Sequence, residues 1–190
     1  MGFPEKNHGK VPSFPALCLD LQDTQWPLTA ITHTRQVARA ILVDEEGMGY
    51  FVRVDRDDDF GKARLIETAG GGVEPGETPE EAVCRELGEE LGADAEVIAR
   101  LGVVSDYYNL IGRHNVNHYF LCRARSFGER HLTGEETHKL CLSTLRLPLR
   151  AAEAEYLACE VYPLGRLLAA RELPVLRLAM AILEKEQKKA

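Results

Sequence analysis

The sequence predicts an α+β protein, built either as separate strand and helix regions or as an α/β/α sandwich. Short apolar stretches that read as strands lie on both sides of one strongly capped helix near the middle of the chain. Residues 162–189 have a helical pattern. The regular βαβαβ order of a doubly wound sheet is missing, so we expect a mixed sheet covered by helices.

The first part of the chain predicts a loose arm followed by a short strand. Residues 1–15 contain three prolines and few periodic apolar residues, which is typical of a segment that does not pack. The stretch "ALCLDL" (16–21) alternates apolar and other residues and predicts a strand. We therefore divide the chain into an N-terminal arm and short strand, 1–34, and one domain, 35–190.

Two strands and a hairpin follow. "QVARAILV" (36–43) and "YFVRV" (50–54) read as strands, and "DEEGMG" between them is a turn signal. The segment "RVDRDDDFGKAR" reads as a charged loop. "RLIET" (64–68) predicts another short strand, which we expect the glycines at 70–72 to end.

The central helix is predicted over residues 79–91. Thr78 and Glu81 form a capping-box pattern, Pro79 suits the first helical position, and Gly92 suits the C′ position. Gly88 lies in the helix interior, where glycine costs about 1 kcal/mol relative to alanine. We therefore expect a loop or ligand to approach the helix closely there.

The second half of the chain predicts three more strands and two helices. The strands are "AEVIARLGVVSDYY" (95–108), "VNHYFLCRAR" (116–125) and "KLCLSTLRL" (139–147), and a polar loop, "GERHLTGEETH", precedes the last of them. Residues 162–189 predict one short and one longer helix, separated around Pro174.

Composition limits the classes of partner. The formal net charge is −7, which disfavours a stable complex with nucleic acid. No apolar run is long enough for a membrane span, and no secretory signal is visible at the start of the sequence. The five cysteines are odd in number and form no CxxC pair, which favours a reducing, cytoplasmic compartment.

The central helix carries a cluster of carboxylates. Glu86, Glu89 and Glu90 are spaced i,i+3 and i,i+4, so their side chains meet and repel one another. A hard divalent cation removes that repulsion, so the cluster is a candidate site for Mg²⁺, with Mn²⁺ as an alternative. Arg85 can reach Glu89 at i,i+4. The alternative is an ordinary solvated acidic face.

The full spacing of this region resembles the Nudix box, G-x5-E-x7-R-E-U-x-E-E-x-G-U, in which U is apolar. The matching residues run from Gly71 to Ala93 and are Gly71, Glu77, Arg85, Glu86, Leu87, Glu89, Glu90, Gly92 and Ala93. Ala93 is the one departure, since a bulkier aliphatic residue is usual there. The order of the surrounding elements is also similar over about 35–185, and the domain at 35–190 is identified as a member of the Nudix hydrolase family.

This resemblance implies an α/β/α sandwich around a mixed sheet and Mg²⁺-dependent hydrolysis of a nucleoside diphosphate linked to another moiety. It implies that Glu86, Glu89 and Glu90 bind the metal, that the carbonyl of Gly70 adds a ligand, and that Glu77 helps directly or through water. Arg85 would orient Glu89. The general base would be Glu90 or a glutamate from a later loop.

Glu135 and Glu136 are candidates for that later base, although an exposed pair of loop residues is the plainer interpretation. Arg39 and Arg53 lie on predicted strands and are candidate phosphate ligands, or are simply exposed. Phe51, Tyr107 and Tyr108 are candidates for stacking on a base, or pack in the core.

Several functions remain open at this point. A nucleotide-sugar or ADP-ribose-like substrate is favoured, and a dinucleoside polyphosphate or a damaged nucleotide is the alternative. A module that binds a nucleotide derivative without cleaving it is the rival from another class, and the complete set of glutamates disfavours it. The N-terminal strand and arm could support a homodimer.

Overall fold

The computed structural model of the chain describes residues 16–132 and 141–188, and their strands form one mixed sheet. The strand order is β1-β6-β7-β2-β3-β4, with β5 paired to β2 and β8 paired to β3. The elements in chain order are β1 (Leu17–Leu21), β2 (His33–Val43), β3 (Met48–Asp58), β4 (Gly61–Glu67), β5 (Ala69–Gly72), α1 (Pro79–Leu91), β6 (Ala93–Tyr108), the 3₁₀ turn η1 (Asn109–Ile111), β7 (Arg113–Phe127), β8 (Ser143–Pro148), α3 (Leu149–Ala158), the 3₁₀ turn η2 (Cys159–Val161) and α4 (Pro163–Gln187).

The pairing of the strands confirms the mixed sheet. β1 runs parallel to β6 and β2 runs parallel to β7, whereas β6–β7, β2–β3, β3–β4, β2–β5 and β3–β8 are antiparallel. The hairpin predicted around "DEEGMG" joins β2 to β3. β1 is part of the same sheet, while the arm predicted over 1–15 lies outside the described residues.

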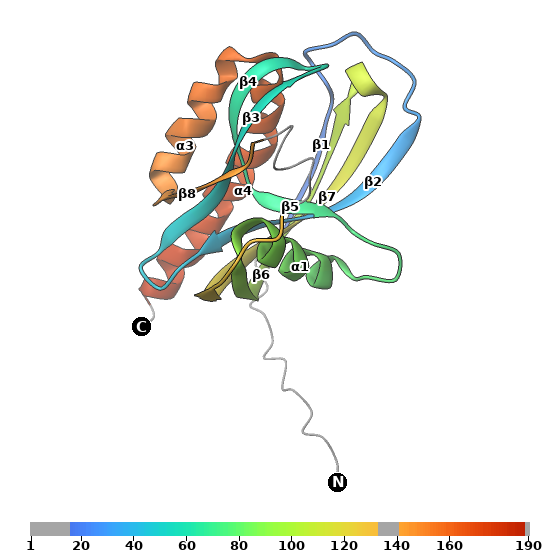
Figure 1. The fold of residues 1–190 in the computed structure, drawn as a ribbon. Coiled ribbons are helices and arrows are strands. Elements are labelled where there is room, and N and C mark those ends of the chain that lie inside the picture. The colour runs from blue at the N-terminus through green and yellow to red at the C-terminus, as the bar shows by residue number, and fades with distance from the viewer. Residues whose placement is uncertain (1–15, 133–140, 189–190) are drawn as a thin grey trace.

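Helices cover both faces of the sheet, as Figure 1 shows, with α1 on one side and α3 and α4 on the other. Side chains alternate along a strand, so β2 contributes to both layers. Ala38, Ala40 and Leu42 pack with α1, and Ile41 and Val43 pack with the α3–α4 layer. The predicted α/β/α sandwich is confirmed.

Helix α1 begins and ends where the sequence predicts. The Thr78 side chain accepts a hydrogen bond from the Glu81 backbone N–H, and the Glu81 carboxylate accepts one from the Thr78 backbone N–H. Gly92 ends the helix with φ +66°, a left-handed conformation that favours glycine. The helix buries its apolar stripe against the sheet, at Ala82, Val83, Leu87 and Leu91.

Two predictions between β3 and α1 are wrong. The charged segment after residue 52 is not a loop but a hairpin, because β3 continues to Asp58 and pairs with β4 from Gly61. The glycines do not end a strand either: Ala69–Gly72 is β5, paired with β2 from Val37 to Ala40. Gly70 has φ +146° and a Cβ there would lie 2.7 Å from the Arg39 Cα, so only glycine allows this close pairing.

The C-terminal helices also differ from the prediction. Leu149–Ala158 forms α3, which was not predicted, and α4 continues through Pro174 without interruption. Proline in a helix interior costs about 3 kcal/mol. Leu173, Val175 and Leu176 around it are buried, and burial of each such side chain contributes about 1.5–3 kcal/mol. Tertiary packing therefore outweighs the local break.

Two further observations concern the helices and the cysteines. Within residues 16–132 and 141–188, every helix is too short or too polar to cross a membrane. All five cysteines lie in this part of the chain and all are free thiols.

Candidate active site

One guanidinium gathers three carboxylates where α1 meets β5. Arg85 donates from Nε and Nη2 to Glu77 at 3.0 and 3.1 Å, and from Nη1 to Glu86 at 2.8 Å and to Glu89 at 3.1 Å. Its Nη2 also donates to the Gly72 carbonyl at 2.9 Å, which ties α1 to the end of β5. The expected Arg85–Glu89 contact is present, and Glu77 proves to be the main partner of Arg85.

The charges of this acidic cluster (Glu77, Glu86, Glu89 and Glu90) perturb one another. Hydrogen bonding to Glu77 is the main reason that the pKa of Arg85 lies above its ordinary value, and the same hydrogen bonds lower the pKa of Glu77. One guanidinium faces several carboxylates, so the acidic cluster keeps a net negative charge that a cation would neutralise.

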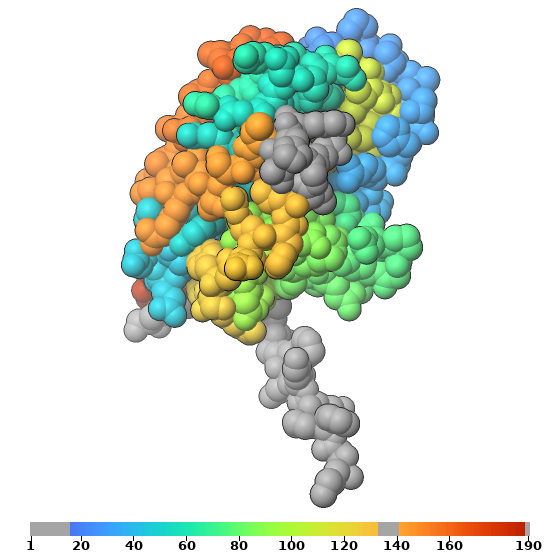
Figure 2. Space-filling view, viewed as in Figure 1, coloured from blue at the N-terminus to red at the C-terminus, as the bar shows by residue number. Residues whose placement is uncertain are grey.

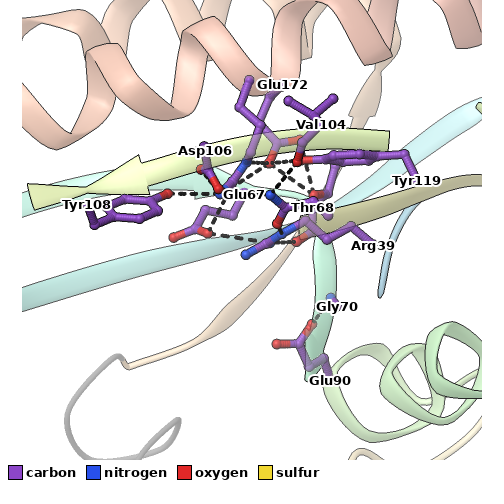
Figure 3. Close-up of polar contacts among 12 residues, drawn as sticks. Arg39, Glu67, Thr68, Gly70, Glu90, Val104, Asp106, Tyr108, Tyr119 and Glu172 are labelled. Atoms are coloured by element: carbon purple, nitrogen blue, oxygen red, sulfur yellow. Dashed lines mark hydrogen bonds and ion pairs between the residues drawn. The ribbon is translucent and has the colours of Figure 1, made fainter. Parts of the chain in front are cut away.

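Close packing against the glycines of β5 positions two of the glutamates. A Cβ on Gly71 would lie 2.6 Å from Cδ of Glu86, so the bare glycine leaves room for that carboxylate. Glu90 accepts a hydrogen bond from the Gly70 backbone N–H at 2.8 Å, which Figure 3 shows. Both carboxyl side chains are buried, with residue exposures of 7 %.

The side chains of this cluster are of the kind that binds a divalent ion, but they are not already arranged around one ion position. In the described part of the chain, no three acidic, histidine or cysteine residues stand close enough together to hold one ion. Arg85 lies between Glu77, Glu86 and Glu89, so an ion would bind beside that guanidinium or displace it. Carboxylate oxygens with a net negative charge are the donors that Mg²⁺ prefers.

A cavity of about 240 Å³ opens next to Glu90, and Gly70 and Gly71 of β5 also line it. An open depression of about 700 Å³ is lined by Glu86, Glu89 and Arg85. Arg35 lines both spaces and lies over Gly72, where a Cβ would be 3.0 Å from its Nη2 atom. Figure 2 shows the blue residues of the β2 region meeting the green residues of β5 and α1 on this face.

The cavity is basic although the protein is acidic. Its arginines are Arg35, Arg39, Arg56 and Arg113, and its acidic residues are Glu67 and Glu90. Arg39 pairs with Glu67 at 3.6 Å, and Arg56 pairs with Asp58. Arg35 and Arg113 form no ion pair with a described residue, so these two guanidinium groups are available to an anionic ligand.

Of the four residues predicted to bind substrate, two line the cavity and two do not. Arg39 and Tyr108 line the cavity. Phe51 and Arg53 do not, because they alternate with Val52 and Val54 on β3 and point to the opposite face. Phe51 is fully buried against Tyr156, and Arg53 pairs with Glu155 of α3 at 3.0 Å. Their assignment to substrate binding does not agree with the structure.

Two other predicted residues lie outside the described part of the chain. Glu135 and Glu136, the candidate later bases, fall within 133–140. The described chain before them passes close to the acidic cluster, because the His131 backbone N–H donates to the Glu89 carbonyl at 2.9 Å. His131 also lines the depression that contains Glu86 and Glu89.

Four residues of the cavity were not predicted from the sequence: Arg35, Arg56, Arg113 and Asn115. They come together only because β2 pairs in parallel with β7, with Arg35 opposite Asn115 in the register, and because Arg56 follows β3 beyond the predicted strand end. The only signal in the sequence was the presence of arginines on strands at alternating positions, which sequence alone cannot orient.

Behind the cavity lies a buried polar network, drawn in Figure 3 between α4 and the sheet. Arg171 of α4 is 1 % exposed and donates to Asp106 at 3.0 Å, to Tyr108 Oη at 2.9 Å and to Glu172 at 2.8 Å. Asn117 connects Asp106 to Arg39, with 2.9 and 3.2 Å bonds. This network fixes Arg39 and Tyr108 in the cavity wall.

Comparison with known proteins agrees with this arrangement. A model of the NUDIX domain family matches residues 33–168, more than half of the chain. A NUDIX hydrolase from Nitrosomonas europaea has a similar structure, with a TM-score of 0.60 and 18 % identity over 78 % of this chain and 90 % of that one. The E. coli ORF135 protein gives a TM-score of 0.53 and 26 % identity over 78 % and 90 % of the two chains.

A curated relative is similar over a shorter region. The 8-oxo-dGTP diphosphatase of Haemophilus influenzae is 46 % identical over 57 residues, which is 30 % of this chain and 40 % of that protein. The family model matches residues 33–168, and the solved NUDIX hydrolase structure has a similar fold. This chain therefore belongs to the NUDIX domain family.

Proposed function

We propose that the protein is a divalent-metal-dependent pyrophosphohydrolase that cleaves the diphosphate of a nucleoside diphosphate linked to another moiety. The observation that carries this proposal is the arrangement around β5. The acidic cluster and the arginine-lined cavity adjoin at this strand. Glu90 lines the cavity, Glu86 and Glu89 line the neighbouring depression, and Arg35 lines both spaces. A diphosphate needs both cations and guanidinium groups to neutralise it.

Each residue has a role in this proposal. Glu86, Glu89 and Glu90 would hold the divalent cation, with the Gly70 carbonyl as an additional ligand, and Arg85 would orient Glu86 and Glu89. When bound, the ion supplies charge neutralisation and lowers the pKa of a water molecule. Glu90, which lines the cavity, would accept a proton from the attacking water, and Glu135 or Glu136 is the alternative base. Arg35, which lines both spaces, binds the phosphate oxygens.

The substrate class has two candidates. A nucleotide-sugar or ADP-ribose-like compound fits the small cavity beside an open, charged depression. The similarity to an 8-oxo-dGTP diphosphatase favours a damaged nucleotide instead. We infer a single nucleotide unit in either case, since a cavity of about 240 Å³ is below the usual size for an entire drug-sized ligand.

The test is hydrolysis with Mg²⁺ or Mn²⁺ of ADP-ribose, UDP- and GDP-sugars, dinucleoside tetraphosphate, 8-oxo-dGTP, NADH and CoA. We expect release of a mononucleotide from at least one compound, and none after removal of the metal with a chelator. Glu89→Gln and Glu90→Gln should each lower turnover by orders of magnitude while the fold survives. Glu80→Gln, an exposed residue in the first turn of the same helix, is the matched control and should retain activity.

Two outcomes would reject the proposal. If no compound is cleaved but one binds, the protein is a nucleotide-sensing module. If Glu89→Gln and Glu90→Gln cleave as fast as the wild-type protein, the glutamates do not have the role assigned to them.

A further inference from the structure

Four buried side-chain polar atoms in the described part of the chain have no hydrogen-bond partner, and two of them belong to residues that line the cavity. These two are Nε of Arg113 and Oδ1 of Asn115. Asn115 is only 4 % exposed. Buried polar groups are almost always hydrogen-bonded, because an unmade bond loses the hydration of the group without replacement. Because both residues line the cavity, a ligand or water in that cavity can complete the hydrogen bonding of the two atoms.

A second asparagine on the same strand, Asn117, shows that the missing hydrogen bond is particular to the site of Asn115. Asn117 lies two residues further along β7 and on the same face. Its Nδ2 donates to the Val104 carbonyl at 2.8 Å and to Asp106 at 2.9 Å, and its Oδ1 accepts from Arg39 at 3.2 Å. The protein satisfies Asn117 completely, but it leaves Oδ1 of Asn115 without a partner.

We propose that Asn115 and Arg113 determine specificity by binding a nucleobase edge that presents an N–H group beside a carbonyl, as in guanine, hypoxanthine and uracil. This inference rests on the proposed function, in that it places the base of the nucleotide substrate in the cavity. Oδ1 of Asn115 only accepts a hydrogen bond, and Nε–H of Arg113 only donates one. The ligand must therefore offer a donor and an acceptor next to each other.

The walls of the cavity select a flat ring over a hydrated sugar. Phe60 and Tyr108 line it together with aliphatic side chains from β2, β3 and α4. The Arg113 guanidinium lies 5.3 Å from the centre of the Tyr108 ring, which holds it on one wall. A nucleobase fills a space of about 240 Å³ as one part of a larger ligand, and its phosphates would extend past Arg35 to the depression beside Glu86.

The carbonyl is the better acceptor for this arginine. Burial is the main reason that the pKa of the Arg113 guanidinium lies below its ordinary value, although the nearby Asp106 charge acts in the opposite direction. An exocyclic carbonyl oxygen projects from the ring, so a guanidinium held on the cavity wall can reach it without also meeting the C–H group that flanks the ring nitrogen of adenine. Adenine presents a ring nitrogen beside its amino group, so we expect adenine nucleotides to bind more weakly than guanine nucleotides.

The experiment measures binding without hydrolysis. Isothermal titration calorimetry in metal-free buffer compares GMP, IMP, AMP and ribose 5-phosphate on the full chain. GMP and IMP should bind at least about tenfold more tightly than AMP and ribose 5-phosphate, the factor that one well-placed hydrogen bond provides. Asn115→Leu should reduce the affinity for GMP to that for AMP and leave the affinity for ribose 5-phosphate unchanged.

Asn117→Leu is the matched control, because it is the same substitution on the same face of the same strand. It breaks three hydrogen bonds within the protein, so it should lower the melting temperature. Asn115→Leu breaks no bond of Oδ1, so its melting temperature should be equal to or above that of the wild-type protein. A loss of binding with full stability separates recognition from a structural role.

Three results would overturn the inference. The base does not lie in this cavity if ribose 5-phosphate binds as tightly as GMP, or if Asn115→Leu leaves GMP binding intact. The prediction that the bound base presents a carbonyl is wrong if AMP binds as tightly as GMP. Because the measurement needs no turnover, these results are independent of whether the protein hydrolyses a diphosphate.

Discussion

The carboxylate of Glu86 lies in the space that a side chain on Gly71 would occupy. A Cβ on Gly71 would stand 2.6 Å from Cδ and 2.7 Å from Oε2 of Glu86, far inside van der Waals contact. The glycine of β5 and the glutamate of α1, 15 positions apart in the sequence, are therefore one structural unit. Without a side chain at position 71, Glu86 reaches Arg85 and stays beside the strand.

The first prediction concerns this contact. Gly71→Ala should displace the flexible Glu86 side chain rather than unfold the sheet, and metal affinity should fall about 10–100-fold, as for other changes that reorient a ligand. Titration with Mn²⁺ measures the effect. Gly72→Ala is the control, since its Cβ would meet only the mobile end of Arg35 at 3.0 Å. Equal metal affinity in both variants would contradict the argument.

The second prediction concerns Gly88. The close approach expected from the sequence is not made by any described residue, because a Cβ there would have no atom within 4 Å. Gly88→Ala should raise the free energy of unfolding by about 0.5–1 kcal/mol, measured by urea denaturation. Gly92→Ala should lower it, because Gly92 has φ +66° and packs against Gly128. A less stable Gly88→Ala protein would show that residue 88 has another role.

The third prediction concerns the ion pairs of α4. Arg171→Met removes the partner of the buried Asp106 and Glu172 carboxylates and should destabilise the protein by about 3–5 kcal/mol. Arg177→Met breaks the more exposed pair with Glu153 and should cost less than about 1 kcal/mol. Denaturation curves of the two variants give the comparison, and similar losses would mean that the buried network is not stabilised as we describe.

The fourth prediction is a dependence on pH. Burial opposes ionisation of Asp106, but the charge of Arg171 and the Asn117 hydrogen bond outweigh it, so the pKa of Asp106 lies below its ordinary value of 3.8. A carboxyl with a depressed folded-state pKa contributes stability above its unfolded pKa and loses it as the pH falls through the folded value. The free energy of unfolding should therefore fall below pH 3.8.

The control for this dependence is Asp106→Asn. Its free energy of unfolding should be lower at neutral pH and should fall less steeply between about pH 4 and 2, because one of the titrating carboxyls is gone. Other carboxyls with lowered pKa values, such as Glu77, will leave part of the slope. An unchanged slope would show that Asp106 does not titrate as described.

The sequence by itself determined the local parts of this protein. The capping box and Gly92 predicted both ends of α1, because caps depend on residues within one turn. The spacing of Glu86, Glu89 and Glu90 predicted one shared face, because the helical period is fixed. The apolar stretches predicted most strands and the layered mixed sheet, which the structure confirms.

Only the tertiary structure decided which way strand residues face and what lies beside them. Arg39 and Arg53 looked alike in sequence, yet one lines the cavity and the other pairs with α3, because the sheet's two faces are defined by packing partners far along the chain. Pro174 looked like a helix end, but burial around it kept α4 continuous. The unpartnered Asn115 and the satisfied Asn117 differ only in their three-dimensional neighbours, and no local pattern encodes those.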